Sequence, residues 1–125
     1  MKKHVLLIDE SDSVLQTIKQ AFTQLIVPFK CTWAKSGLQG VEQIKYLLPD
    51  IVLLNVNITG LDVFTTIEAI REIKHASTVP LIVYWFGLNN QSYINESLPG
   101  ATGYLKNGTP GELITTFSRY LPGIK

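Results

Sequence analysis

Five short apolar runs, each followed by a segment of helical character, constrain this chain more than any other feature of its sequence. Regular alternation of buried strands with helices is typical of a parallel sheet that carries helices on both faces. The sequence therefore predicts an α/β protein. The strands are expected at His4–Ile8, Phe29–Ala34, Ile51–Asn55, Leu81–Trp85 and around Gly103–Leu105.

The segments between these runs carry the signals of helices. Apolar residues from Val14 to Ile26 recur at three- and four-residue spacing, and Ser11 or Asp12 can accept hydrogen bonds from first-turn amides. Ser36 to Gln39 and Thr109 to Glu112 match the reciprocal capping pattern, which predicts two further helix starts. Further helices are expected at Asp62–Lys74, near Gln91–Leu98, and around the apolar residues Leu113, Ile114, Phe117 and Leu121.

Length and charge narrow the functional classes. The 125 residues fit one domain, 1–125, and 11 basic against 10 acidic residues give a net charge of +1. So small a charge argues against direct binding of nucleic acid or an anionic membrane. The apolar run that ends at Ile8 is too short for a signal peptide or a membrane span, and a single cysteine, Cys31, suits a reducing compartment. We expect a cytoplasmic protein.

Polar side chains stand at the ends of several predicted strands. The carboxyl ends of parallel strands meet at one edge of a sheet, so Asp9, Glu10, Asn55 and Trp85 are expected to lie close together. Two adjacent acids at such an edge can bind a hard divalent cation such as Mg²⁺. They can equally well lie at the positive end of the first helix without any metal. Spacing alone leaves both interpretations open.

The motifs together resemble the response regulator receiver domain over nearly the whole chain. The matching segments are Val5–Glu10, Pro49–Asn57, Gly60–Asp62, Val79–Val83 and Gly100–Leu105. The resemblance implies a flavodoxin-like fold, a five-stranded parallel sheet of order 2-1-3-4-5. It also implies a site in which paired acids and a backbone carbonyl bind Mg²⁺ while a third-strand aspartate accepts phosphate from a histidine kinase. Those roles would map onto Asp9, Glu10, Asn57 and Asn55.

The sequence departs from this family where phosphate would be handled. Asn55 replaces the phosphoacceptor, and a neutral amide is too weak a nucleophile to form an acyl phosphate. Trp85 stands where the family has a serine or threonine, and an indole offers only one donor. Strict alignment puts Asn107 at the family's lysine position, whereas one deleted residue would make Lys106 the equivalent. Tyr104 matches the aromatic residue that changes orientation on activation.

The leading hypothesis is an atypical, phosphorylation-independent receiver domain that acts as a protein-interaction module in signal transduction. The resemblance places the partner surface, for signalling proteins or a second copy of the chain, on the fourth helix, fifth strand and fifth helix. No cofactor is required under this hypothesis, and whether Mg²⁺ binds at Asp9, Glu10 and Asn57 is left open. The candidate interface residues are Tyr93, Ile94, Tyr104, Glu112, Thr116 and Tyr120.

Four alternatives remain open from the sequence. The chain is a conventional Mg²⁺-dependent phosphoacceptor seen as an aspartate-to-asparagine variant, or the receiver part of a DNA-binding transcription regulator. It is a metal-dependent enzyme that processes a small phosphodonor, which Asn55 disfavours because the nucleophile is missing. The last alternative is a small-ligand pocket lined by Tyr84, Trp85 and Phe86. A module that is not an enzyme is the preferred interpretation.

Overall fold

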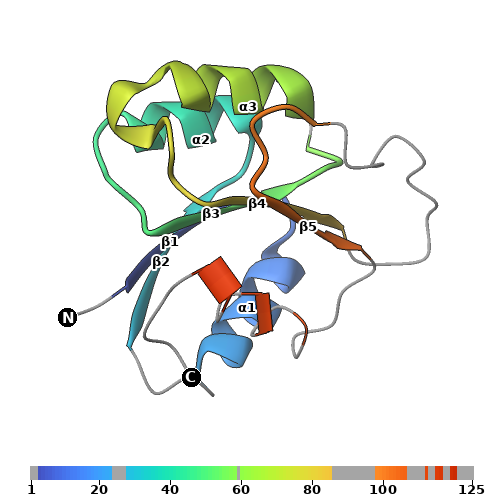
Figure 1. Cartoon of the computed structure of the whole chain (residues 1–125). Coiled ribbons are helices and arrows are strands. Elements are labelled where there is room, and N and C mark those ends of the chain that lie inside the picture. The colour runs from blue at the N-terminus through green and yellow to red at the C-terminus, as the bar shows by residue number, and fades with distance from the viewer. Residues whose placement is uncertain are drawn as a thin grey trace.

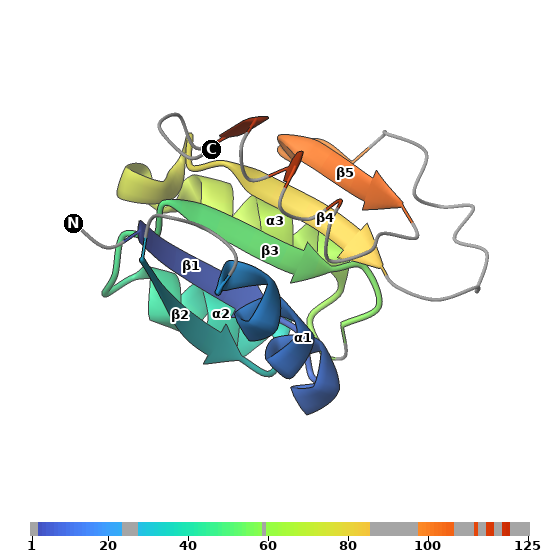
Figure 2. The ribbon, with the colours of Figure 1, turned by 90° about the horizontal axis from the view of Figure 1, so that it is seen from below.

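A computed structural model describes residues 3–23, 28–58, 60–85, 98–106, 112, 115–116 and 119–120. Its core is one parallel sheet in the order β2-β1-β3-β4-β5, and Figure 2 shows the five strands side by side. This order confirms the flavodoxin-like topology that the motifs implied. The strands are β1 (Lys3–Ile8), β2 (Phe29–Ala34), β3 (Ile51–Asn55), β4 (Leu81–Trp85) and β5 (Gly103–Lys106).

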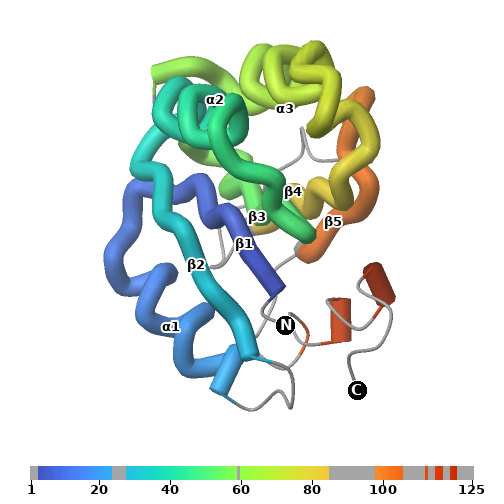
Figure 3. Tube along the Cα trace, turned by 90° about the vertical axis from the view of Figure 1, so that its left-hand side faces the viewer, coloured from blue at the N-terminus to red at the C-terminus, as the bar shows by residue number. Residues whose placement is uncertain are grey.

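Helices cover both faces of the sheet. In Figure 1, α2 (Gly37–Ile44) and α3 (Val63–Glu72) lie on one face, and α1 (Asp12–Phe22) lies on the other. Figure 3 shows the same three layers from the side. The helical residues 112, 115–116 and 119–120 are on the α1 side. Within the described residues, we find no helix long and apolar enough to span a bilayer.

Each face of the sheet has its own apolar core, built from alternate residues of the central strands. Leu6 and Leu54 pack on the α2 and α3 side, whereas Leu7 and Leu53 pack on the α1 side. Successive side chains of a strand point to opposite faces, so this alternation also sets the direction of the residues that follow. Because of this alternation, Asp9 continues the α1-side positions of β1, and Asn55 continues those of β3.

The predicted caps are present at the described helix starts. The Ser11 hydroxyl accepts from the Val14 N–H at 3.2 Å, and the Ser36 hydroxyl accepts from the Gln39 N–H at 3.1 Å. The Gln39 side chain accepts in turn from the Lys35 N–H at 2.9 Å, one residue before the position that the reciprocal pattern predicts. Sequence signals therefore place these helix starts to within one residue.

The predicted helix Asp62–Lys74 was too long at its C-terminal end. Asp62 is the N-cap, α3 ends at Glu72, and Ile73 takes an extended conformation with φ −78° and ψ 119°. A 3₁₀ turn, Lys74–Ala76, follows, and Ala76 is completely buried. The helix predicted near Gln91–Leu98 lies outside the described residues except for Leu98, as does most of the last predicted helix.

Arg71 ties the end of α3 to the segments before and after β4. Its guanidinium donates to the carbonyls of Ala76, Val79 and Gly100 at 2.6 to 3.0 Å. Gly100 has φ +92°, and a Cβ there would lie 2.7 Å from Ile67 Cγ2, so the chain can turn at this residue only without a side chain. Partial burial of the guanidinium lowers the pKa of Arg71.

We expect Arg71→Lys to lower the free energy of unfolding by about 2–3 kcal/mol, because an ammonium cannot reproduce the charge-assisted bonds that the planar guanidinium makes to three carbonyls. Urea denaturation followed by circular dichroism measures the change. The control is Arg119→Lys, the same substitution at an exposed helical position, which should change stability little. Equal effects of the two substitutions would contradict the role assigned to Arg71.

His4 gives a testable pH dependence. Its ring Nε2 lies 2.6 Å from the Thr32 hydroxyl, and its pKa is lowered from 6.5 by burial and by nearby Lys30, against an opposing effect of Asp50. Because the folded pKa is below the unfolded value, this contribution to stability is complete above pH 6.5 and is lost as the pH falls through the folded pKa. Proton NMR should show His4 titrating below 6.5, with assignment by a His4→Gln variant.

Candidate functional site

Three side chains from three adjacent strands meet at the carboxyl edge of the sheet. Asp9 follows β1, Asn55 ends β3, and Tyr84 is the register partner of Asn55 in β4. Asn55 Nδ2 donates to Asp9 Oδ2 at 2.8 Å, and the Tyr84 hydroxyl donates to the same oxygen at 2.5 Å. The predicted convergence of Asp9 and Asn55 is thus present, and Tyr84 completes the cluster.

The Asp9 carboxylate is buried and fully engaged by neutral donors. Its residue exposure is 1%, and its second oxygen, Oδ1, accepts from the Ser11 N–H at 2.9 Å. A buried carboxylate is costly unless hydrogen bonds or an opposite charge stabilise it. In the described part of the chain the only ion pair joins Lys45 to Glu42, so hydrogen bonds perform this role at Asp9.

The orientation of the Asn55 amide is fixed by its two neighbours. Asn55 Oδ1 accepts from the Asn57 N–H at 2.7 Å while its Nδ2 donates to Asp9. The opposite orientation would place an oxygen against the Asp9 carboxylate and an NH₂ group against the Asn57 N–H, which is a donor. Both ends of the amide therefore have a single consistent assignment. The group at position 55 acts as a hydrogen-bond donor toward Asp9.

Tyr84 is a site residue whose contact with Asp9 sequence reasoning missed. It is fully buried among the apolar residues of the α1 side, where the sequence analysis placed it only in an aromatic pocket. Burial, followed by the charge and hydrogen bond of Asp9, raises the pKa of Tyr84 well above its usual value. The signal for this role was available: a tyrosine inside an aliphatic strand needs a partner for its hydroxyl, and a strand-end carboxylate lay within reach.

Trp33 is a second residue that the sequence analysis did not single out. Its indole N–H donates to the backbone carbonyl of Asp9 at 2.6 Å, and Lys35 Nζ lies 4.9 Å from the centre of its ring. The indole therefore holds the β1 end from the β2 side, while the Tyr84 hydroxyl holds it from the β4 side. The turn after β1 is fixed from both neighbouring directions.

The other predicted site residues differ in exposure and in how much of them the structure describes. Glu10 and Asn57 are exposed, Trp85 and Lys106 are register partners whose side chains are not described, and Asn107 lies outside the described residues. Tyr104 is half-buried, and its hydroxyl exchanges hydrogen bonds with the N–H and carbonyl of Leu98 at 3.2 and 3.3 Å. Tyr104 is thus anchored to the backbone that precedes β5.

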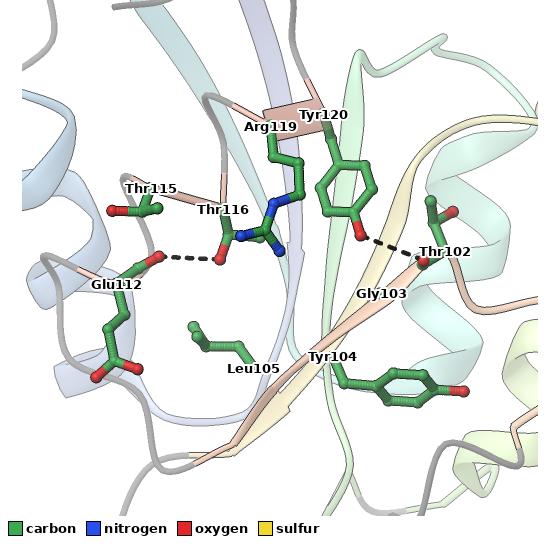
Figure 4. Close-up of a pocket in the computed structure, with 9 residues that line it drawn as sticks. All are labelled: Thr102, Gly103, Tyr104, Leu105, Glu112, Thr115, Thr116, Arg119 and Tyr120. Atoms are coloured by element: carbon green, nitrogen blue, oxygen red, sulfur yellow. Dashed lines mark hydrogen bonds between the residues drawn. The ribbon is translucent and has the colours of Figure 1, made fainter.

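The candidate interface residues lie partly on a groove of about 610 Å³ between β5 and the C-terminal helical residues (Figure 4). Glu112 is exposed, Tyr120 is half-buried and donates to the Thr102 carbonyl at 3.4 Å, and Thr116 is buried at 7% exposure. Thr116 lines the groove but exposes little of its own surface. Figure 4 shows Tyr104 pointing away from these residues, and Tyr93 and Ile94 lie outside the described range.

The residues at Asp9 do not fit a divalent cation in this arrangement. A hard cation needs several oxygen ligands directed at one point, and Asn55 directs hydrogens, not oxygen, at Asp9. Glu10 and Asn57 are exposed, and the described residues contain no group of three histidine, cysteine, aspartate or glutamate side chains suited to hold a metal. The metal site predicted from Asp9, Glu10 and Asn57 stays a prediction, and in this arrangement Asp9 Oδ2 is engaged by Asn55 and Tyr84.

Comparison with known proteins agrees with the fold and the motifs. The response regulator receiver domain model matches residues 5–117, so the chain belongs to this family, the receiver domain of two-component response regulators. The chemotaxis response regulator CheY4 of Vibrio cholerae has a similar structure, with TM-score 0.83, 21% identity, and coverage of 97% of this chain and 100% of that one.

Two further proteins are similar to this chain. The nitrate/nitrite response regulator protein NarL of Escherichia coli K12 is 26% identical over 95% of this chain and 55% of its own length. The chain thus spans about half the length of the curated relatives it matches. The receiver domain of sensor histidine kinase PA1611 from Pseudomonas aeruginosa PAO1, with a magnesium ion in its active site cleft, has TM-score 0.79, 18% identity, and coverage of 96% and 98%.

We expect Tyr84→Phe to lower the free energy of unfolding by about 1.5–3 kcal/mol, because a buried carboxylate loses a charge-assisted donor while the ring volume is kept. Denaturant titration measures the change. Tyr46→Phe removes a hydroxyl from a residue that is 86% exposed and should leave stability unaltered. A Tyr84→Phe protein as stable as the wild type would show that the hydroxyl does not support Asp9.

Proposed function

We propose that this chain is an atypical receiver domain that signals through protein contacts without aspartyl phosphorylation. The observation that carries the proposal is the hydrogen bond from Asn55 Nδ2 to Asp9 Oδ2. Asn55 occupies the position that accepts phosphate in the family. Its neutral amide instead donates a hydrogen bond to the Asp9 carboxylate. This arrangement supports recognition and provides no covalent chemistry.

The chemistry of the amide supports this proposal. A carboxamide oxygen is neutral and a weak nucleophile, and Asn55 Oδ1 also accepts a hydrogen bond from the Asn57 N–H, which lowers its nucleophilicity further. Tryptophan at position 85 removes the hydroxyl that resemblance to the family leads one to expect. Several phosphate-handling positions have thus changed together, which favours a changed role over a single inactivating substitution.

Magnesium is not required by the proposed function. A metal ion is reported in the active site cleft of the PA1611 receiver domain, whereas the donors around Asp9 here already satisfy its carboxylate. A module that only binds partners needs no electrophilic assistance at this edge. We infer a non-enzymatic role in the cytoplasm.

The proposed partner surface is the groove between β5 and the C-terminal helical residues. Glu112 and Arg119 are exposed charges of opposite sign on this groove, and Tyr120 contributes an aromatic ring beside Gly103. Aromatic residues and arginine are enriched in protein interfaces, and charges at the rim favour correct pairing. A signalling protein or a second copy of this chain would bind here. If the chain is part of a longer regulator, output would pass through the same surface.

We expect no phosphoryl group on the wild-type chain after incubation with acetyl phosphate and Mg²⁺, because position 55 has no carboxylate to accept one. Intact-protein mass spectrometry at neutral pH checks this. A receiver domain with an aspartate at the equivalent position, treated in parallel, shows that the donor is active. A phosphoryl adduct on Asn55 would overturn the proposed function.

A photo-crosslinking amino acid at position 112 or 119 should capture the same partner in cells, because both side chains are exposed on the groove. The matched control is position 46, where Tyr46 is 86% exposed at the end of α2 on the other face of the sheet. Capture should persist when cellular acetyl phosphate is depleted. Capture from position 46 alone would contradict the assigned surface.

A further inference from the structure

We propose that Asn55 and Tyr84 replace a divalent cation at Asp9, so that the site is closed to Mg²⁺ and the single change Asn55→Asp opens it. This inference concerns the same edge of the sheet as the proposed function and rests on it, because both take Asn55 as a hydrogen-bond donor to Asp9. Its test measures metal binding and stability, whereas the tests of the proposed function measure phosphorylation and partner contacts. The inference and the proposed function can therefore fail separately.

Both oxygens of the Asp9 carboxylate already accept hydrogen bonds. Oδ2 accepts from two side-chain donors at 2.8 and 2.5 Å, and Oδ1 accepts from the Ser11 N–H at 2.9 Å. A cation that approached Oδ2 would have to displace both the Asn55 amide and the Tyr84 hydroxyl. The Tyr84 hydroxyl would then lose its hydrogen bond to the Asp9 carboxylate among apolar side chains, which costs free energy.

The second step is the charge at the site. Asp9 and the adjacent, exposed Glu10 place two carboxylates at the end of β1, and the neutral amide at position 55 adds no negative charge beside them. Affinity for a divalent cation grows with the number of charged oxygen ligands. An uncharged donor at position 55 therefore lowers the affinity of the site and also fills the space between the two strand ends.

The third step is the effect of restoring a carboxylate. In Asn55→Asp the 2.8 Å contact with Asp9 Oδ2 would join two carboxylate oxygens in place of a donor and an acceptor. Two like charges at this separation cannot both stay ionised without a proton or a cation between them. The variant should therefore be unstable in the absence of metal, and Mg²⁺ should stabilise it by binding between the two side chains.

Tyr84 determines how tightly the restored site binds Mg²⁺. Its hydroxyl donates to Asp9 Oδ2, the oxygen that also faces position 55, so it competes with a cation even after the amide is gone. Removing this hydroxyl in the double variant Asn55→Asp/Tyr84→Phe frees that oxygen. The double variant should bind Mg²⁺ more tightly than Asn55→Asp alone, whereas Tyr84→Phe alone should gain no metal site because the Asn55 amide remains.

The experiment measures thermal unfolding midpoints and calorimetric heats of the full chain, freed of metal with EDTA, during a MgCl₂ titration at constant ionic strength. The wild type should show no saturable heat and no midpoint shift. Asn55→Asp should unfold roughly 5–10 °C lower without metal and recover most of that loss with Mg²⁺. Gln43→Glu, the same amide-to-acid change on the exposed side of α2, should show no Mg²⁺ response.

Asn55→Ala separates charge from the lost donor, since it removes the amide without adding a carboxylate. It should lower the midpoint with no recovery by Mg²⁺. Saturable Mg²⁺ binding by the wild type that is abolished in Asp9→Asn would overturn the inference, as would an Asn55→Asp protein that is as stable as the wild type without metal. The wild-type titration decides the question even if Asn55→Asp fails to fold under both conditions.

Discussion

The buried carboxylate of Asp9 is the constraint on which the functional edge of this protein depends. A charged group at 1% exposure beside two apolar cores must be stabilised, and the surrounding chain does so with three hydrogen-bond donors from different segments. Those donors also join the ends of β1, β3 and β4. The hydrogen bonds that stabilise the Asp9 carboxylate therefore also fix the positions of these strand ends. The same bonds explain why a neutral residue at position 55 is compatible with the fold, since an amide is the right partner for an acid held in this position.

Under the proposed function, this domain signals by recognition, because the fold is kept while position 55 has no carboxylate. The parallel sheet still brings strand ends together, and the helices still cover both faces. Tyr104 is anchored to the backbone of Leu98, and Arg71 holds the turn at Gly100 on the preceding side. These contacts hold the segment that precedes β5, and none of them involves Asn55. A groove of defined shape beside β5 is what such a rigid frame can present to another protein.

Much of the fold was predictable because its signals are local. Strand positions were correct to within one residue, and the serine caps of α1 and α2 lay where the sequence placed them. The end of α3 was predicted two residues too far, because burial of Ala76 and the reach of Arg71 toward the carbonyls of Ala76 and Val79 decide that boundary. The grouping of Asp9 with Asn55 followed from strand direction alone. The interface role of Thr116 stays a prediction, and its 7% exposure could not be foreseen because it depends on how the helix packs.

By itself the sequence determined the order of strands and helices, the starts of the helices, and the absence of a nucleophile at position 55. Each of these follows from residue type and spacing along the chain, through the side-chain alternation of strands, the helical repeat and the chemistry of an amide. Only the tertiary structure decided that Asn55 and Tyr84 share one oxygen of Asp9, across sequence separations of 46 and 75 residues. Whether the acidic edge presents free oxygens to a cation or is already satisfied depends on distances between strands, and no pattern along the chain encodes those distances.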